Sequence, residues 1–337
     1  MNSAEFYNFS KKEEFGISNA ERYAFISFMS FVFITSLIGD LIILVSSIRF
    51  KALRLNGFIV STIQHLAVCD ILGSLLFILP QIISLMANEW VLGNFLCQVT
   101  ALLPHYLGCV NRIQTAVMAT ARVIKLKLTN SRAALSMTGK AGHVIGVMIW
   151  FSVLPLSIAM VYLEYDGAYF DYRTALCDIP FRADTWKYLI PSILVLYVFV
   201  PLFVVIVTTG ILLYHLARAR QVSRRIGATE GWQGLVTVTM TATVFCLSNL
   251  PFIVYRLALN LITDIHGFFH NEFYRSVWAL LSINILCNFF IYCITINSFR
   301  EFLKDGVRNF MHNVILCRNA IHGRILQAST SGKKVKI

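Results

Sequence analysis

Charged and amide side chains interrupt stretches of the chain that are otherwise apolar. Ionisable groups inside such stretches are costly to bury, so they are candidates for function. Among the polar side chains in these stretches are six that we call the polar set: Asp40, Asp70, Asn111, Arg112, Asn284 and Asn288. Because a buried arginine left without a carboxylate is strongly unfavourable, we expect Arg112 to pair with Asp70 or Asp40.

No residue pattern typical of an enzyme accompanies this set. The sequence contains no nucleophile–base pair, no glycine-rich phosphate loop and no Cys/His spacing of a metal site. Its eight cysteines are too few for a disulfide scaffold in 337 residues. We therefore expect no catalysis and no bound metal of the Cys/His type.

The composition indicates a membrane protein. Of the 337 residues 57% are hydrophobic and 14% charged, and the mean hydropathy is +0.68. Soluble domains are closer to about 25% charged. A helix needs roughly 20 apolar residues to cross a bilayer. Seven stretches reach that length: Phe25–Ser47, Phe58–Met86, Phe95–Ala119, Ala141–Leu163, Tyr188–Leu216, Leu235–Leu261 and Val277–Ile296. The predicted fold is an all-α bundle of seven transmembrane helices.

The charges of the loops predict the orientation. Lys and Arg gather in the loops after the first, third and fifth stretches, whereas most acids stand in the alternate loops. Basic loops remain cytosolic. The N-terminus is therefore expected outside a plasma-membrane protein that crosses the bilayer several times. The net charge of +12 reflects this topology and not a surface for nucleic acid.

Four regions follow from this organisation. Residues 1–22 form an extracellular tail with an N-glycosylation sequon at Asn8, and residues 23–297 form the seven-helix domain. Residues 298–311 are expected to form a short amphipathic helix on the inner leaflet. Residues 312–337 form a cytosolic tail whose Cys317 is either palmitoylated or a free thiol.

Motifs along the seven stretches resemble those of the rhodopsin-like (class A) G-protein-coupled receptors. They occur in the family's order and spacing: Gly39-Asp40, Leu66-Ala67-Val68-Cys69-Asp70, Trp90, Cys97, Arg122, Trp150, Pro201, Phe245, Pro251 and Asn288-Phe289-Phe290-Ile291-Tyr292. The segment Asn88–Gln98 is weakly similar to melatonin-type receptors, although the histidine of their fifth helix is absent.

The resemblance implies roles for three residues. It pairs Cys97 with Cys177 in a disulfide outside the membrane, and it makes Arg122 the residue that engages the G protein. The aspartate that normally precedes this arginine is Ala121 here, so we expect raised basal activity. The alternative is an arginine that only extends to the membrane surface.

The resemblance also implies an ion site and a switch. Asp70, Asn111, Asn284 and Asn288 match the cluster that holds sodium in the family, and this chain adds Asp40 and Arg112 near it. Pairing of Arg112 with a carboxylate would weaken or replace the ion. Alternatively, Asp70 is only a structural hydrogen-bonding group. The activation switch would comprise Phe245, Asn249, Pro251 and Tyr292, with Asn249 in place of the family's tryptophan.

The ligand is a small molecule or a peptide that the sequence does not identify. Candidates for its pocket are His105, Tyr106, Tyr255, Arg256 and Trp278. Such an aromatic cleft with a cation would take an anionic or indole-like molecule, unless these residues only pack. Pro104 stands where amine receptors have an acid, and Ser282 where retinal proteins have a lysine. We therefore expect neither a classical amine nor retinal.

These features predict a receptor that passes an extracellular signal to heterotrimeric G proteins. A seven-helix scavenger or partner subunit that does not couple is one alternative. A transporter or channel using Asp40, Asp70 and Arg112 as an ion path is another, although the odd number of helices and the absence of internal repeats disfavour it.

Overall fold

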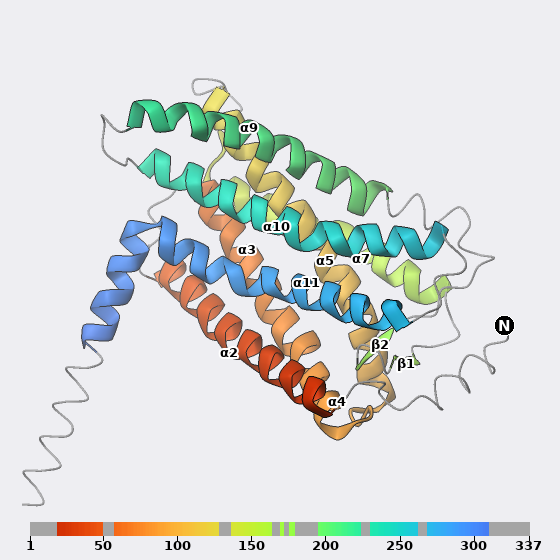
Figure 1. Cartoon of the computed structure of the whole chain (residues 1–337). Helices are drawn as coiled ribbons and strands as arrows, with labels where there is room; N and C mark the ends of the chain where they lie inside the picture. The colour runs from red at the N-terminus through yellow and green to blue at the C-terminus, as the bar shows by residue number, and fades with distance from the viewer. Residues whose placement is uncertain are drawn as a thin grey trace, which may run out of the picture.

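The computed structural model describes residues 19–49, 57–127, 136–163, 169–171, 175–178, 195–223, 230–261 and 268–309. These residues form a bundle of seven helical segments, which confirms the predicted fold (Figure 1). The segments are α2 (Asn19–Arg49), α3 (Gly57–Gly73) continued by η1 (Ser74–Ile78) and α4 (Leu79–Ala87), α5 (Gly93–Lys127), α7 (Gly139–Leu163), η2 (Val195–Phe199) continued by α9 (Val200–Ser223), α10 (Glu230–Leu261) and α11 (Phe268–Thr295). A shorter helix follows at 297–309.

Several helices extend beyond the predicted apolar stretches. The first begins at Asn19 instead of Phe25, and α5 continues to Lys127 instead of ending at Ala119. Hydropathy marks the part of a helix that lies in the hydrocarbon, whereas the backbone hydrogen bonds continue through the polar turns at the membrane surface. The helix at 297–309 lies close to the predicted range of 298–311.

Two of the membrane helices contain a π-helical turn, and each turn precedes a proline. The turn η1 ends two residues before Pro80, and η2 ends two residues before Pro201. A proline ring collides with the carbonyl group four residues earlier, and a π turn widens the helix at that point. These prolines therefore explain why the second and fifth segments are each divided.

Five stretches of described residues are long and apolar enough to cross a membrane. They are Asn19–Ile48, Gly57–Ala87, Tyr197–Arg218, Gln233–Val254 and Ser276–Thr295. The polar residues of α5 lower its hydropathy, yet α5 contacts α3, α7, α9 and α10. Large exposed side chains of α2 recur every three or four residues, as on a face toward lipid: Phe31, Ile34, Ile38, Leu41, Val45 and Ile48.

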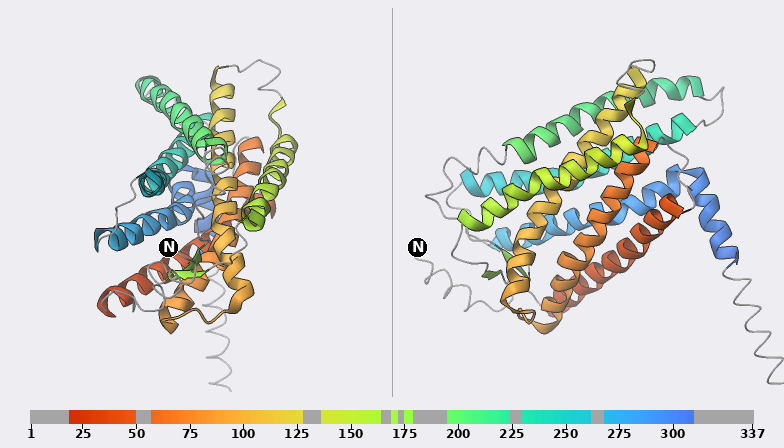
Figure 2. Two further views of the ribbon diagram at one scale, coloured as in Figure 1. Left: turned by 90° about the vertical axis from the view of Figure 1, so that its right-hand side faces the viewer. Right: turned by 180° about the vertical axis from the view of Figure 1, so that it is seen from behind.

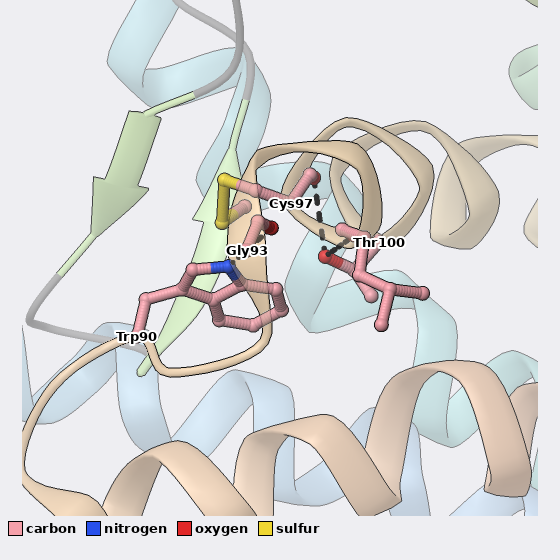
Figure 3. Close-up of a disulfide and its surroundings, with 6 residues drawn as sticks. Trp90, Gly93, Cys97 and Thr100 are labelled. Atoms are coloured by element: carbon pink, nitrogen blue, oxygen red, sulfur yellow. Dashed lines mark hydrogen bonds between the residues drawn. A yellow bond between two sulfur atoms is a disulfide. The ribbon is translucent and has the colours of Figure 1, made fainter.

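A two-stranded hairpin is attached to one end of the bundle. Strand β1 (Tyr169–Asp171) pairs antiparallel with β2 (Leu176–Asp178), so that Phe170 lies opposite Cys177. The disulfide between Cys97 and Cys177 ties β2 to the first turns of α5, as predicted (Figure 3). We call this the disulfide end; the helix at 297–309 extends from the opposite end (Figure 1).

Candidate functional site

A fully buried carboxylate, that of Asp70 on α3, joins three helices near the middle of the bundle. Its Oδ1 accepts a hydrogen bond of 3.3 Å from Nδ2 of Asn111 on α5. Its Oδ2 accepts one of 2.6 Å from Nδ2 of Asn288 on α11. Because a buried carboxylate needs donors, these two amides stabilise the position of Asp70.

A second buried carboxylate, Asp40 on α2, lies within electrostatic range of Asp70. The residue is 1% exposed, and neither of its side-chain oxygens has a hydrogen-bond donor among the described residues. Asn284 is also buried, one turn of α11 before Asn288. The structure thus gathers most of the predicted polar set around two acids, one with donors and one without.

The oxygens at this position fit a hard cation. Asp40 supplies two carboxylate oxygens without donors, and Asn111 and Asn288 use their amide nitrogens toward Asp70, which leaves their oxygens for another partner. Sodium, calcium and magnesium are bound by such carboxylate and amide oxygens. A cation would also offset the repulsion between the two acids.

The prediction that Arg112 pairs with Asp70 or Asp40 is wrong. The residue is 7% exposed, and its Nη2 donates to Sγ of Cys109 at 3.4 Å. No salt bridge among the described residues joins it to a carboxylate. Arg112 follows Asn111 directly, so it is rotated by about 100° around α5 from the face that meets Asp70. Its guanidinium lies over Gly108, where a Cβ would be 3.3 Å from Nη2.

Two of the predicted switch residues of α10, Phe245 and Asn249, are buried, and Pro251 is half-buried. Phe245 packs in a cluster with Ala116 of α5 and with residues of α9, including Val205. The Asn249 side chain donates from Nδ2 to the Phe245 carbonyl at 3.0 Å. Its amide nitrogen therefore bonds within α10, two residues before Pro251, and does not join α10 to another helix.

Arg122 lies near the end of α5 that is remote from the disulfide, and it is 9% exposed. One turn earlier, Met118 belongs to a buried cluster that includes Leu212 of α9, Val238 of α10 and Tyr292 of α11. The preceding residue, Ala121, is buried and brings no carboxylate. Arg122 thus lies one turn from the core in which α5 meets α9, α10 and α11.

Of the predicted pocket residues with described side chains, Tyr106 and Trp278 belong to different clusters. The Tyr106 hydroxyl donates to the Trp150 carbonyl at 2.9 Å, so this side chain faces α7. The Trp278 ring lies 5.2 Å from those of both Phe77 and Phe252, in a different cluster. His105 is half-buried on α5. Tyr255 and Arg256 are residues of α10 whose side chains lie outside the described part of the structure, and Asn8 and Cys317 lie outside it entirely.

Sequence reasoning missed two features of the packing. Leu176 of the hairpin is buried between the membrane helices, and nothing in its local sequence marks it apart from the neighbouring cysteine. Phe289 replaces the family's proline, and its ring is accommodated at Gly39 of α2. The match between this large residue and the glycine can be recognised only once α2 and α11 are known to be neighbours.

Comparison with known proteins finds similarity along most of the bundle. Residues 39–292 match the model of the seven-transmembrane receptor family of the rhodopsin type. A relative, 5-hydroxytryptamine receptor 4 of Cavia porcellus, is 31% identical over 144 residues. That similarity covers 39% of this chain and spans 36% of the relative's length.

Proposed function

Because the chain belongs to the rhodopsin family of seven-transmembrane receptors, we propose that it transmits an extracellular ligand signal to a heterotrimeric G protein. The observation that supports this proposal most is the position of Arg122. It is buried at one end of the bundle, beside a core that α5 shares with α9, α10 and α11. Movement of α10 away from α5 would uncover this cation for a partner.

The residue that precedes Arg122 in the sequence, Ala121, bears on the resting state. A carboxylate at position 121 would give the guanidinium a partner inside the bundle and oppose its exposure. Ala121 offers none, so the inactive arrangement lacks one stabilising contact. The proposed receptor therefore signals without ligand more than one that carries the acid.

The proposed orientation places the disulfide end outside the cell. Disulfides persist in oxidising compartments, and the Cys97–Cys177 bond lies at one end only. The end of α5 that leads into a basic loop predicted to be cytosolic is the end remote from Cys97. A plasma-membrane receptor with an extracellular N-terminus agrees with both observations.

The proposed ligand differs from the amine for which the relative, a 5-hydroxytryptamine receptor, is named. A protonated amine needs a carboxylate partner, and the half of α5 nearest the disulfide contains no Asp or Glu. Pro104 occupies the position of the family's amine-binding acid. We place this receptor outside the amine receptors, and Ser282 on α11 leaves no lysine there for retinal.

We further propose a sodium ion beside Asp40 and Asp70. The basis for doubting sodium was a pair between Arg112 and one of these acids, which is not formed. Two carboxylates and nearby amide oxygens suit this ion. Sodium would neutralise a repulsion between α2 and α3, and would thereby stabilise the resting bundle.

Nucleotide exchange on purified G proteins tests the proposal. The receptor in lipid nanodiscs should accelerate GTP binding by at least one class of Gα subunit without any added ligand. No exchange with any class, together with ligand uptake in cells, would instead favour a scavenger or partner subunit. Ionic currents in reconstituted bilayers would favour the channel or transporter.

A further inference from the structure

A residue of the extracellular hairpin is buried among the membrane helices. Leu176 of β2 is 3% exposed and belongs to an apolar cluster at the disulfide end. The other buried members of this cluster come from α2, η1, α4 and α11: Met29, Val32, Phe77, Ile78, Ile82 and Trp278. Leu176 is thus the one buried member that no membrane helix supplies.

The hairpin holds Leu176 in this position from three directions. Its neighbour Cys177 is bonded to Cys97 of α5, and Leu176 itself pairs with Asp171 across the hairpin. On the other side, Ala175 is fully buried and has a φ of 55°, a left-handed conformation that is unfavourable for a residue with a Cβ. Figure 2 (left) shows the hairpin lying over the end of the bundle.

The surroundings of Leu176 suit a neutral hydrocarbon group. The side chains packed in this cluster are aliphatic, thioether and aromatic groups, and a charged occupant among them would be desolvated. Ligands of membrane receptors enter from outside, and this cluster lies at the end where the disulfide is. Leu176 therefore fills, from within the chain, a space that is chemically suited to an apolar ligand.

A short series of ring contacts leads from this cluster to the switch helix. Trp278, which shares the cluster with Leu176, meets Phe252 of α10 edge to face at 5.2 Å. Phe252 follows Pro251 directly, at the break in the backbone hydrogen bonds of α10. An occupant that sets the position of Trp278 therefore acts on the part of α10 that can bend.

We propose that Leu176 is a built-in ligand: the hairpin permanently inserts an isobutyl group between α2, α4 and α11 and thereby supports basal signalling. The inference rests on the proposed coupling to a G protein. An occupant shifts an equilibrium only through contacts that differ between the two states. Because the disulfide keeps Leu176 in place, its contribution is constant instead of depending on an external concentration.

The test compares Leu176→Ala with wild type in nanodiscs, using ligand-free nucleotide exchange per folded receptor. We expect the variant to lose roughly fivefold or more of the exchange, the lower end of the usual coupling between two sites. The matched control is Leu107→Ala, which removes the same atoms from a buried position on α5 outside this cluster. It should lower the melting temperature and leave exchange per folded receptor unchanged.

Rescue by a small hydrocarbon separates occupancy from loss of folding. Leu→Ala removes a three-carbon fragment, which propane can replace. Propane at saturating pressure should therefore restore much of the nucleotide exchange of Leu176→Ala. It should leave the nucleotide exchange of Leu107→Ala unchanged. The proposal of a built-in ligand would be overturned if Leu176→Ala kept the nucleotide exchange of wild type. It would also be overturned if propane did not reverse the loss of exchange. A wild type without any exchange would instead contradict the proposed function itself.

Discussion

Phe289 of α11 lies directly against Gly39 of α2. A Cβ on Gly39 would come within 2.7 Å of the Cγ of Phe289 and 2.8 Å of its Cβ. The same ring meets Phe299 of the helix at 297–309 edge to face, with centroids 6.3 Å apart. The phenylalanine that replaces the family's proline therefore links three helices, and the glycine opposite it makes this possible.

This contact predicts that Gly39→Ala destabilises the receptor. The added methyl group overlaps the Phe289 ring, and overpacking of this kind costs about 1–3 kcal/mol. The melting temperature of the purified protein should fall. The double variant Gly39→Ala/Phe289→Ala should lose less than the sum of the two single variants, because alanine lacks the Cγ and the ring that the added methyl group overlaps. An unchanged melting temperature in Gly39→Ala would mean that α2 and α11 are farther apart than described here.

Replacing Arg112, which has no carboxylate partner among the described residues, should instead stabilise the protein. Arg112 is buried with a thiol as its hydrogen-bond partner among the described residues, and a buried cation without a carboxylate is unfavourable. We expect Arg112→Leu to raise the melting temperature. Arg112→Lys, which retains the charge, is the matched control and should give no gain. A lower melting temperature in Arg112→Leu would indicate a counter-ion beside the guanidinium.

Sodium should stabilise the protein through Asp40 and Asp70. We expect a higher melting temperature in sodium chloride than in choline chloride at equal concentration. Asp70→Asn should remove this difference, and Asp40→Asn should reduce it. The exposed acid Asp305 provides a control, since Asp305→Asn should keep the full effect of sodium. A sodium effect that survives in both buried variants would contradict the ion site.

Placing an acid directly before Arg122 should lower the basal signalling of the receptor. In Ala121→Asp the new carboxylate can pair with the guanidinium, so basal second-messenger output should fall. The matched control is Ala121→Asn, which adds a side chain of the same size without the charge. A fall of equal size in both variants would assign the effect to packing at this buried position and not to the ion pair.

Features that depend on order along the chain could be predicted from the sequence. Seven apolar stretches fixed the fold class, and the resemblance supplied the Cys97–Cys177 pair that the structure contains. Features that depend on rotation about a helix or on loop paths could not. Arg112 and Asn111 are adjacent in sequence, yet only one faces Asp70, and hydropathy does not show that Leu176 enters the bundle.

The most direct test of the central claim is ligand-free second-messenger output in cells that express wild type or Arg122→Ala at matched surface levels. If Arg122 engages a G protein, wild type should signal above mock-transfected cells, and the variant should fall to the mock level. Equal output above mock from both proteins would contradict the assigned role of Arg122.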